Sequence, residues 1–166
     1  MDPASSHHKL RLVVLVSGVG SLMNSVVEAT HDPAYPAEIV AVGADRPCAG
    51  LERAAAAGLE TFLVNFADYD NRDDWDSALA DAISAYQPDL VISAGFMRIT
   101  GKNVLSEFGG RFINTHPALL PAFKGAHAVE DALAYGVKYT GSSIHLVDEG
   151  VDTCLLYTSD AADDSL

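Results

Sequence analysis

An asparagine and a histidine, separated by one residue, have the types and spacing that suit acid–base chemistry at a carbonyl group. Asn114 and His116 lie in the string Asn-Thr-His-Pro-Ala-Leu-Leu-Pro, residues 114–121. The asparagine amide offers a hydrogen-bond donor, and an imidazole exchanges protons near neutral pH. Together they could hold a carbonyl oxygen and protonate the species formed when that carbonyl is attacked. The structural alternative is that Asn114 caps a turn and His116 is a hydrogen-bonded loop histidine.

A strand must position this pair. The short apolar run Arg111-Phe112-Ile113 predicts the end of a buried strand. Pro117 lacks a backbone donor, and it disfavours helical geometry at His116. We therefore expect the strand to stop at Asn114 and to present both side chains at its carboxyl end. In an open α/β sheet, ligands bind at that end.

A second candidate site follows the first predicted strand, the apolar run of residues 10–17. The loop Ser17-Gly18-Val19-Gly20-Ser21 leads from it into a helix. Its glycines allow backbone N–H groups to approach a phosphate, which the amino end of a helix also favours. A plain tight turn is the alternative, because the third glycine of the dinucleotide-binding pattern is absent. Without that pattern, Asp45 is interpreted as an ordinary loop carboxylate after the second strand.

The remaining elements alternate between strands and helices, which predicts one α/β domain with a mostly parallel, Rossmann-like sheet flanked by helices. Further strands are expected at residues 37–44, 61–64, 90–94 and 138–147, and further helices at 50–57, 71–86 and after 127. The residues expected on the inward faces of three helices are Leu22, Val26 and Val27, then Trp75, Leu79 and Ile83, and finally Val129, Ala132 and Leu133. The acid-rich stretch at residues 68–76 is expected to cap and begin the helix that runs to Tyr86.

The string at 114–121 resembles the signature of the folate-dependent formyltransferases. Supporting matches are the glycine loop at 17–21, the string Ala94-Gly95-Phe96-Met97-Arg98-Ile99, and Gly141-Ser142-Ser143-Ile144-His145 leading to Asp152. The resemblance implies the Rossmann-like formyltransferase fold. It also implies that a formyl group moves from 10-formyltetrahydrofolate to the amine of phosphoribosylglycinamide.

In this reaction, the resemblance implies that Asn114 donates a hydrogen bond to the oxyanion and that His116 acts as general acid. Asp152 would favour the charged form of the imidazole. No metal or covalent intermediate is needed. The alternatives are another formyltransferase or a formyltetrahydrofolate hydrolase of the same fold, or a non-catalytic module that binds a nucleotide or folate.

The resemblance also assigns binding residues. Those expected at the folate are Arg72, Met97, Arg98, Ile99, Thr100 and Asn114, and those expected at the ribonucleotide are Gly18, Gly20, Ser21 and Leu22. Thr100 departs from the leucine common in the family, and Leu22 stands at or near a usual asparagine. Phe96, Met97 and Ile99 could instead plug the core beneath their loop.

Composition narrows the class of protein. The chain has 166 residues, of which 49% are hydrophobic, yet no apolar run reaches the roughly 20 residues of a membrane helix. This favours a soluble, cytoplasmic protein without membrane contact. The net charge of −13 disfavours binding to nucleic acid. Cys48 and Cys154 lack the spacing of a metal site. The oligomeric state stays open, and a homodimer is one option.

The two ends of the chain differ from its middle. Residues 1–8 are expected to form a disordered leader, and residues 9–152 a formyltransferase domain that is incomplete at its carboxyl end. Residues 153–166 do not continue the family pattern. Their string from Cys154 to Asp163 resembles a translated sequencing adapter, so we interpret this tail as non-native or disordered. With its carboxyl end incomplete, the domain is expected to be weakly stable and poorly active or inactive.

Overall fold

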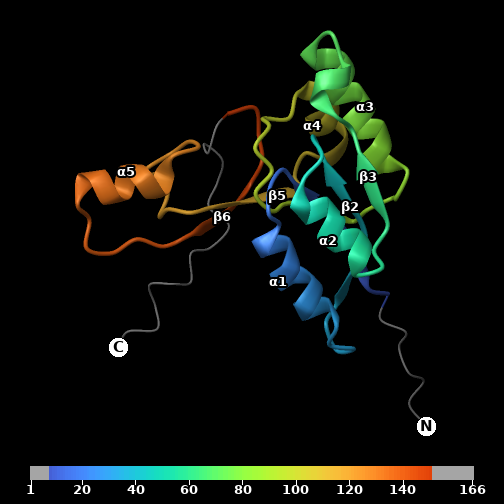
Figure 1. Cartoon of the computed structure of the whole chain (residues 1–166), viewed down its shortest axis with the longest axis horizontal. Helices are drawn as coiled ribbons and strands as arrows, with labels where there is room; N and C mark the ends of the chain where they lie inside the picture. The colour runs from blue at the N-terminus through green and yellow to red at the C-terminus, as the bar shows by residue number, and fades with distance from the viewer. Residues whose placement is uncertain (1–7, 151–166) are drawn as a thin grey trace.

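The computed structural model describes residues 8–150 and contains a six-stranded sheet in the order β3-β2-β1-β4-β5-β6 (Figure 1). Neighbouring strands are parallel except β5 and β6, which are antiparallel. The strands are β1 (Leu10–Val16), β2 (Ala37–Ala44), β3 (Thr61–Leu63), β4 (Leu90–Ser93), β5 (Phe112–His116) and β6 (Ser143–Leu146). The helices are α1 (Ser21–Thr30), α2 (Ala49–Ala56), α3 (Arg72–Ser84), α4 (Lys102–Phe108) and α5 (Ala128–Tyr135), with a 3₁₀ turn at Phe66–Asp68. The predicted α/β class with a mostly parallel sheet is confirmed.

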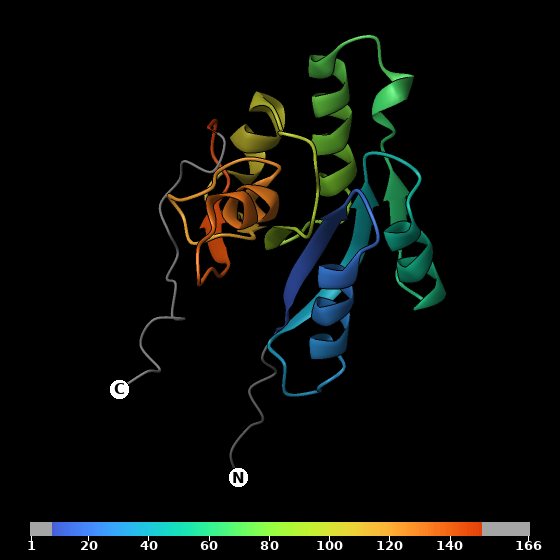
Figure 2. The same cartoon turned by 60° about the vertical axis from the view of Figure 1, so that its left-hand side comes forward.

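The apolar run of β1 is buried on both faces, as expected for a central parallel strand. Val13 and Leu15 belong to a core cluster that includes residues of α3 and α4. Val14 and Val16 belong to a second cluster with residues of α1 and α2. The two helix pairs therefore cover opposite faces of the sheet (Figure 2). This layering leaves the carboxyl ends of β1, β4 and β5 for a site.

Helix α3 forms as the sequence predicts. The Asn71 side chain accepts a hydrogen bond from the Asp74 amide over 2.9 Å, so Asn71 caps the helix. Trp75, Leu79 and Ile83 are fully buried on its inner face. The acidic stretch therefore begins a helix, where carboxylates favour the amino end of the dipole.

The predicted end of β5 is wrong. The strand does not stop at Asn114 but continues to His116. Its last residues pair with β6, with Asn114 opposite His145 and His116 opposite Ser143. An antiparallel partner supplies the hydrogen bonds that keep the backbone extended up to Pro117.

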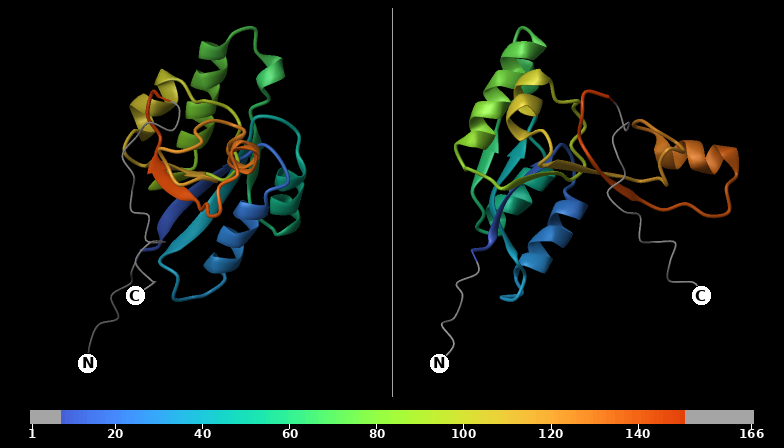
Figure 3. Two further views of the ribbon diagram at one scale, coloured as in Figure 1. Left: turned by 90° about the vertical axis from the view of Figure 1, so that its left-hand side faces the viewer. Right: turned by 180° about the vertical axis from the view of Figure 1, so that it is seen from behind.

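Two predicted helix faces are only partly confirmed, and α4 was not predicted. In α5, Ala128 and Ala132 are buried, whereas Val129 and Leu133 are 51% and 76% exposed. Figures 1 and 3 show α5 standing out from the body of the sheet, so little of the described chain covers that face. In α1, Met23 and Val27 are buried and Leu22 is exposed.

Some expectations lie outside the described residues. These are the role of Asp152, the tail at 153–166 and most of the leader at 1–8. Within residues 8–150, no helix is long and apolar enough to cross a membrane.

Candidate active site

Two pockets meet at the end of β5. The β4–β5 pocket, about 400 Å³ in volume, is lined by the loop after β4 and by residues of β5 and β6. The glycine-loop pocket, about 530 Å³, is lined by residues 18–22 and by residues near the ends of β4, β5 and β6. Both volumes suit small-molecule sites. The residues common to both pockets are Gly95, Thr115, His116 and Pro117.

His116 lies at this junction and is almost completely buried. Its Nε2 atom is 2.7 Å from the carbonyl oxygen of Phe123. A carbonyl oxygen only accepts hydrogen bonds, so Nε2 carries the proton and donates it. This bond holds the imidazole against the segment that follows β5, with the ring bordering both pockets.

Asn114 lies two residues earlier, opposite His145 in the β5–β6 ladder. His145 Nδ1 is 3.0 Å from the carbonyl oxygen of Leu146 and therefore donates to it. His145 Nε2 is then the acceptor for the Asn114 Nδ2 amide, 3.2 Å away. One amide hydrogen of Asn114 is thus committed to His145, and this bond sets the plane of the amide beside the pocket.

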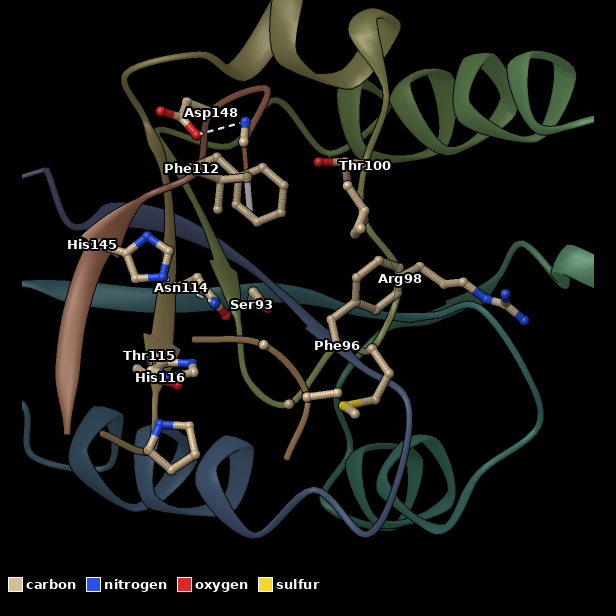
Figure 4. Close-up of a pocket in the computed structure, with 18 residues that line it drawn as sticks. Ser93, Phe96, Arg98, Thr100, Phe112, Asn114, Thr115, His116, His145 and Asp148 are labelled. Carbon is tan, nitrogen blue, oxygen red and sulfur yellow. Dashed lines mark hydrogen bonds between the residues drawn. The ribbon is translucent and has the colours of Figure 1, made fainter. Parts of the chain in front are cut away.

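Across the β4–β5 pocket lies the 95–101 loop, the segment between β4 and α4. Figure 4 shows Asn114, His116 and His145 on one side of the pocket, and Phe96, Arg98 and Thr100 on the other. Phe96 is buried and stacks on Trp75 at 6.3 Å between ring centroids. Met97 and Ile99 are 60% and 51% exposed. Both interpretations of this loop therefore apply in part: Phe96 packs in the core, whereas Met97 and Ile99 are accessible to a ligand.

The middle of the 95–101 loop has two further features. An Arg72 side-chain nitrogen donates to the carbonyl oxygen of Ile99, which ties the loop to the start of α3. Arg72 itself does not line either pocket. The buried Oγ1 of Thr100 has no hydrogen-bond partner among residues 8–150.

The glycine loop packs closely on α2. Gly20 has a φ of 76°, a conformation that side chains disfavour. The Gly50 amide donates to the carbonyl oxygen of Gly18 over 2.8 Å. Gly18, Gly20, Ser21 and Leu22 all line the glycine-loop pocket. The residues expected at the ribonucleotide are therefore together, and they border the same pocket as His116.

Asp45 was misjudged as an ordinary loop carboxylate. It is fully buried, and its Oδ1 accepts from Ser17 Oγ at 2.5 Å. Its Oδ2 accepts from Nη2 of Arg46 at 2.7 Å and from Nε of Arg98 at 3.1 Å. Burial by itself raises the pKa of Asp45, but the hydrogen bonds from Arg46, Ser17 and Arg98 outweigh it and hold that pKa below its ordinary value. The sequence held a signal for this contact, because Ser17 and Asp45 each directly follow the last residue of two strands that pair in the sheet.

Asp76 is a second buried carboxylate near the site. The sequence did not predict that it holds the 95–101 loop. From α3 it accepts hydrogen bonds from the amides of Gly101, Asn103 and Val104. These amides lie at the end of the 95–101 loop and the start of α4. Within residues 8–150, no group of three or more His, Cys, Asp or Glu side chains could hold a metal ion.

Comparisons with known proteins show to which family the chain is similar. Residues 10–163 match the family model described as Formyl transferase. A phosphoribosylglycinamide formyltransferase of Mycobacterium tuberculosis is 59% identical over 143 residues, which cover 86% of this chain and 66% of that protein. The Escherichia coli K12 enzyme of the same name is 37% identical over 144 residues, covering 86% of this chain and 68% of that protein.

Solved structures show the same fold. The crystal structure of glycinamide ribonucleotide transformylase 1 from Symbiobacterium toebii superposes with a TM-score of 0.88 at 37% identity, covering 93% of this chain and 73% of that one. Among the relatives, the match to the Mycobacterium tuberculosis protein covers 66% of that protein, which is just under two thirds of its length. Family model, relatives and fold agree, and the chain belongs to the formyl transferase family.

Proposed function

We propose that this protein transfers the formyl group of 10-formyltetrahydrofolate to the amine of phosphoribosylglycinamide, a step of purine synthesis. The names of the Mycobacterium tuberculosis and Escherichia coli relatives support this activity. The observation that carries it is the meeting of the two pockets at His116. A donor in one pocket and an acceptor in the other would bring their reacting groups together beside that imidazole.

The donor occupies the β4–β5 pocket in this proposal. The exposed side chains of Met97 and Ile99 offer apolar contacts to the flat pterin ring, and backbone groups of the 95–101 loop can bond its polar edge. Arg98 and Thr100 line the same pocket. Arg72 acts through its bond to Ile99, since it lines neither pocket.

The ribonucleotide occupies the glycine-loop pocket. Backbone N–H groups at Gly20 and Ser21, at the amino end of α1, suit a phosphate. Such local donors are needed because the net charge of −13 repels an anion at long range. This arrangement directs the glycinamide amine of the substrate towards His116 and the formyl carbon.

The chemistry then follows from positions at the end of β5. The amine nitrogen attacks the formyl carbon, a carbon–nitrogen bond forms, and the carbonyl oxygen becomes an oxyanion. Asn114, oriented by His145, donates a hydrogen bond to that oxygen, and protonated His116 stabilises it. The attacking amine loses a proton, and N10 of the folate gains one through His116. The oxyanion then re-forms the carbonyl as the bond between the formyl carbon and N10 breaks. Asp152, outside the described residues, is assigned to support the charged imidazole.

A formyl-transfer assay with the ribonucleotide and 10-formyltetrahydrofolate tests this proposal. We expect formylated ribonucleotide to appear in proportion to enzyme. We also expect phosphoribosylglycinamide to raise the melting temperature, because a ligand that binds only the folded state stabilises it. NAD and transfer RNA should not raise it. Stabilisation without transfer would favour a binding module, and an absence of both would refute the proposal.

A further inference from the structure

A buried polar cluster joins the glycine loop to the 95–101 loop. Ser17 Oγ donates to Asp45 Oδ1 at 2.5 Å and accepts from the backbone amide of Met97 at 2.8 Å. The Ser17 amide also donates to the carbonyl oxygen of Gly95 over 3.2 Å. The ends of β1 and β2 and the loop after β4 therefore converge on one carboxylate.

The next residue of the loop is held by the same carboxylate. Arg98 Nε is 3.1 Å from Asp45 Oδ2, and the guanidinium carbon lies 4.0 Å from the centre of the Phe66 ring. Arg46 binds the same oxygen at 2.7 Å. Asp45 thus lies between two guanidinium groups and a hydroxyl, and its full burial requires such partners.

Met97 and Arg98 line the β4–β5 pocket, whereas Asp45 lines neither pocket. The cluster reaches the β4–β5 pocket through these two residues and through Gly95, whose carbonyl oxygen accepts from the Ser17 amide. It fixes the Met97 backbone through Ser17 and the Arg98 side chain directly.

We propose that Asp45 is a positioning residue for the formyl donor: through Ser17 and Arg98 it holds the first half of the 95–101 loop in the conformation that receives the donor. This role rests on the proposed function of the β4–β5 pocket. An aspartate suits it better than an asparagine, because both carboxylate oxygens accept hydrogen bonds. The amide nitrogen of asparagine would face either the two arginines or the serine hydroxyl.

The test uses Asp45→Asn and, as a second variant, Ser17→Ala, with Asp81→Asn as control. Asp81 lies on the exposed face of α3, so the control makes the same chemical change away from the cluster. Hydrogen exchange at the Met97 amide is measured by NMR, together with KM for donor and acceptor and with kcat. For Asp45→Asn and Ser17→Ala we expect exchange at Met97 to rise roughly tenfold, as loss of one hydrogen bond allows. We expect KM for the donor to rise at least about fivefold, with smaller changes in kcat and in KM for the ribonucleotide.

Two results would overturn the proposal. One is unchanged protection of the Met97 amide in Asp45→Asn, and the other is loss of protection with an unchanged KM for the donor. Should Asp45→Asn fail to fold, Ser17→Ala decides by the same criteria. If the parent chain transfers no formyl group, the proposed function fails separately. Met97 exchange and calorimetric binding of 10-formyltetrahydrofolate then decide the role of Asp45, with unchanged binding in the variants overturning it.

Discussion

Asp76 provides the sharpest test of how the site is supported. Its carboxylate is buried, and it accepts hydrogen bonds from the amides of Gly101 at 2.6 Å, Asn103 at 2.8 Å and Val104 at 3.3 Å. The first turn of a helix has no intrahelical partner for its N–H groups. Asp76 therefore caps α4 from a neighbouring helix and fixes the end of the 95–101 loop.

We predict that Asp76→Ala lowers the free energy of unfolding by about 3 kcal/mol. The change removes the acceptor of three amides, and an intramolecular hydrogen bond contributes roughly 1 kcal/mol net. A lost helix cap alone costs about 0.5–2 kcal/mol, and the excess arises because these amides are buried or partly buried. Asp76→Asn keeps one acceptor oxygen; placed at the Oδ2 position, it retains the bonds from Asn103 and Val104, so by the same count the loss is about 1 kcal/mol.

Urea unfolding followed by circular dichroism measures both variants against the parent. Asp81→Ala is the matched control, because Asp81 is on the exposed side of the same helix. Its effect should stay within about 0.5 kcal/mol. A loss below about 1 kcal/mol for Asp76→Ala would refute the capping argument, as would an equal loss for the control.

Four further predictions follow from the same structure. His116→Ala should lower the transfer rate by about 10²–10⁴-fold in the formyl-transfer assay, while calorimetry shows folate binding retained. Thr100→Val should raise the free energy of unfolding in urea by about 1 kcal/mol, because it removes a buried hydroxyl without a partner among residues 8–150; a loss would contradict this. Gly50→Ala should lower the free energy of unfolding by about 1–3 kcal/mol, because the new Cβ would lie 2.9 Å from the carbonyl oxygen of Gly18. A Cβ added at Gly18 would meet nothing within 4 Å, so Gly18→Ala should lower it far less in the same urea titration. The pKa of Asp45 in the folded state lies below its ordinary 3.8, so ionised Asp45 stabilises the fold above that pH, and this stabilisation is lost as the pH falls through the lower folded value. Urea midpoints between about pH 6 and pH 3 should therefore fall more steeply for the parent than for Asp45→Asn. Parallel curves would contradict the assignment.

Local patterns in the sequence were sufficient for most of the sheet. The run Ala37–Ala44 was predicted as a strand with the bounds that β2 has, and β1 differs by one residue. The inner face of α3 followed from the spacing of Trp75, Leu79 and Ile83. Such patterns are informative because a chain segment shows its own apolar periodicity wherever its partner comes from.

The motifs also placed the candidate site at the carboxyl ends of the strands. The structure brings residues of the glycine loop, the 95–101 loop and the end of β5 to two adjoining pockets. The catalytic roles of Asn114, His116 and Asp152 stay predictions.

Other features depend on which segments meet, and only the tertiary structure decided them. β5 extends to His116 because β6 pairs with it, and the exposed face of α5 reflects how little of the described chain packs there. Asp45 lies in a buried cluster with Ser17, Arg46 and Arg98. Ser17 and Arg98 come from distant parts of the chain. A carboxylate's environment is set by such non-local partners, and no periodicity in its own segment records them.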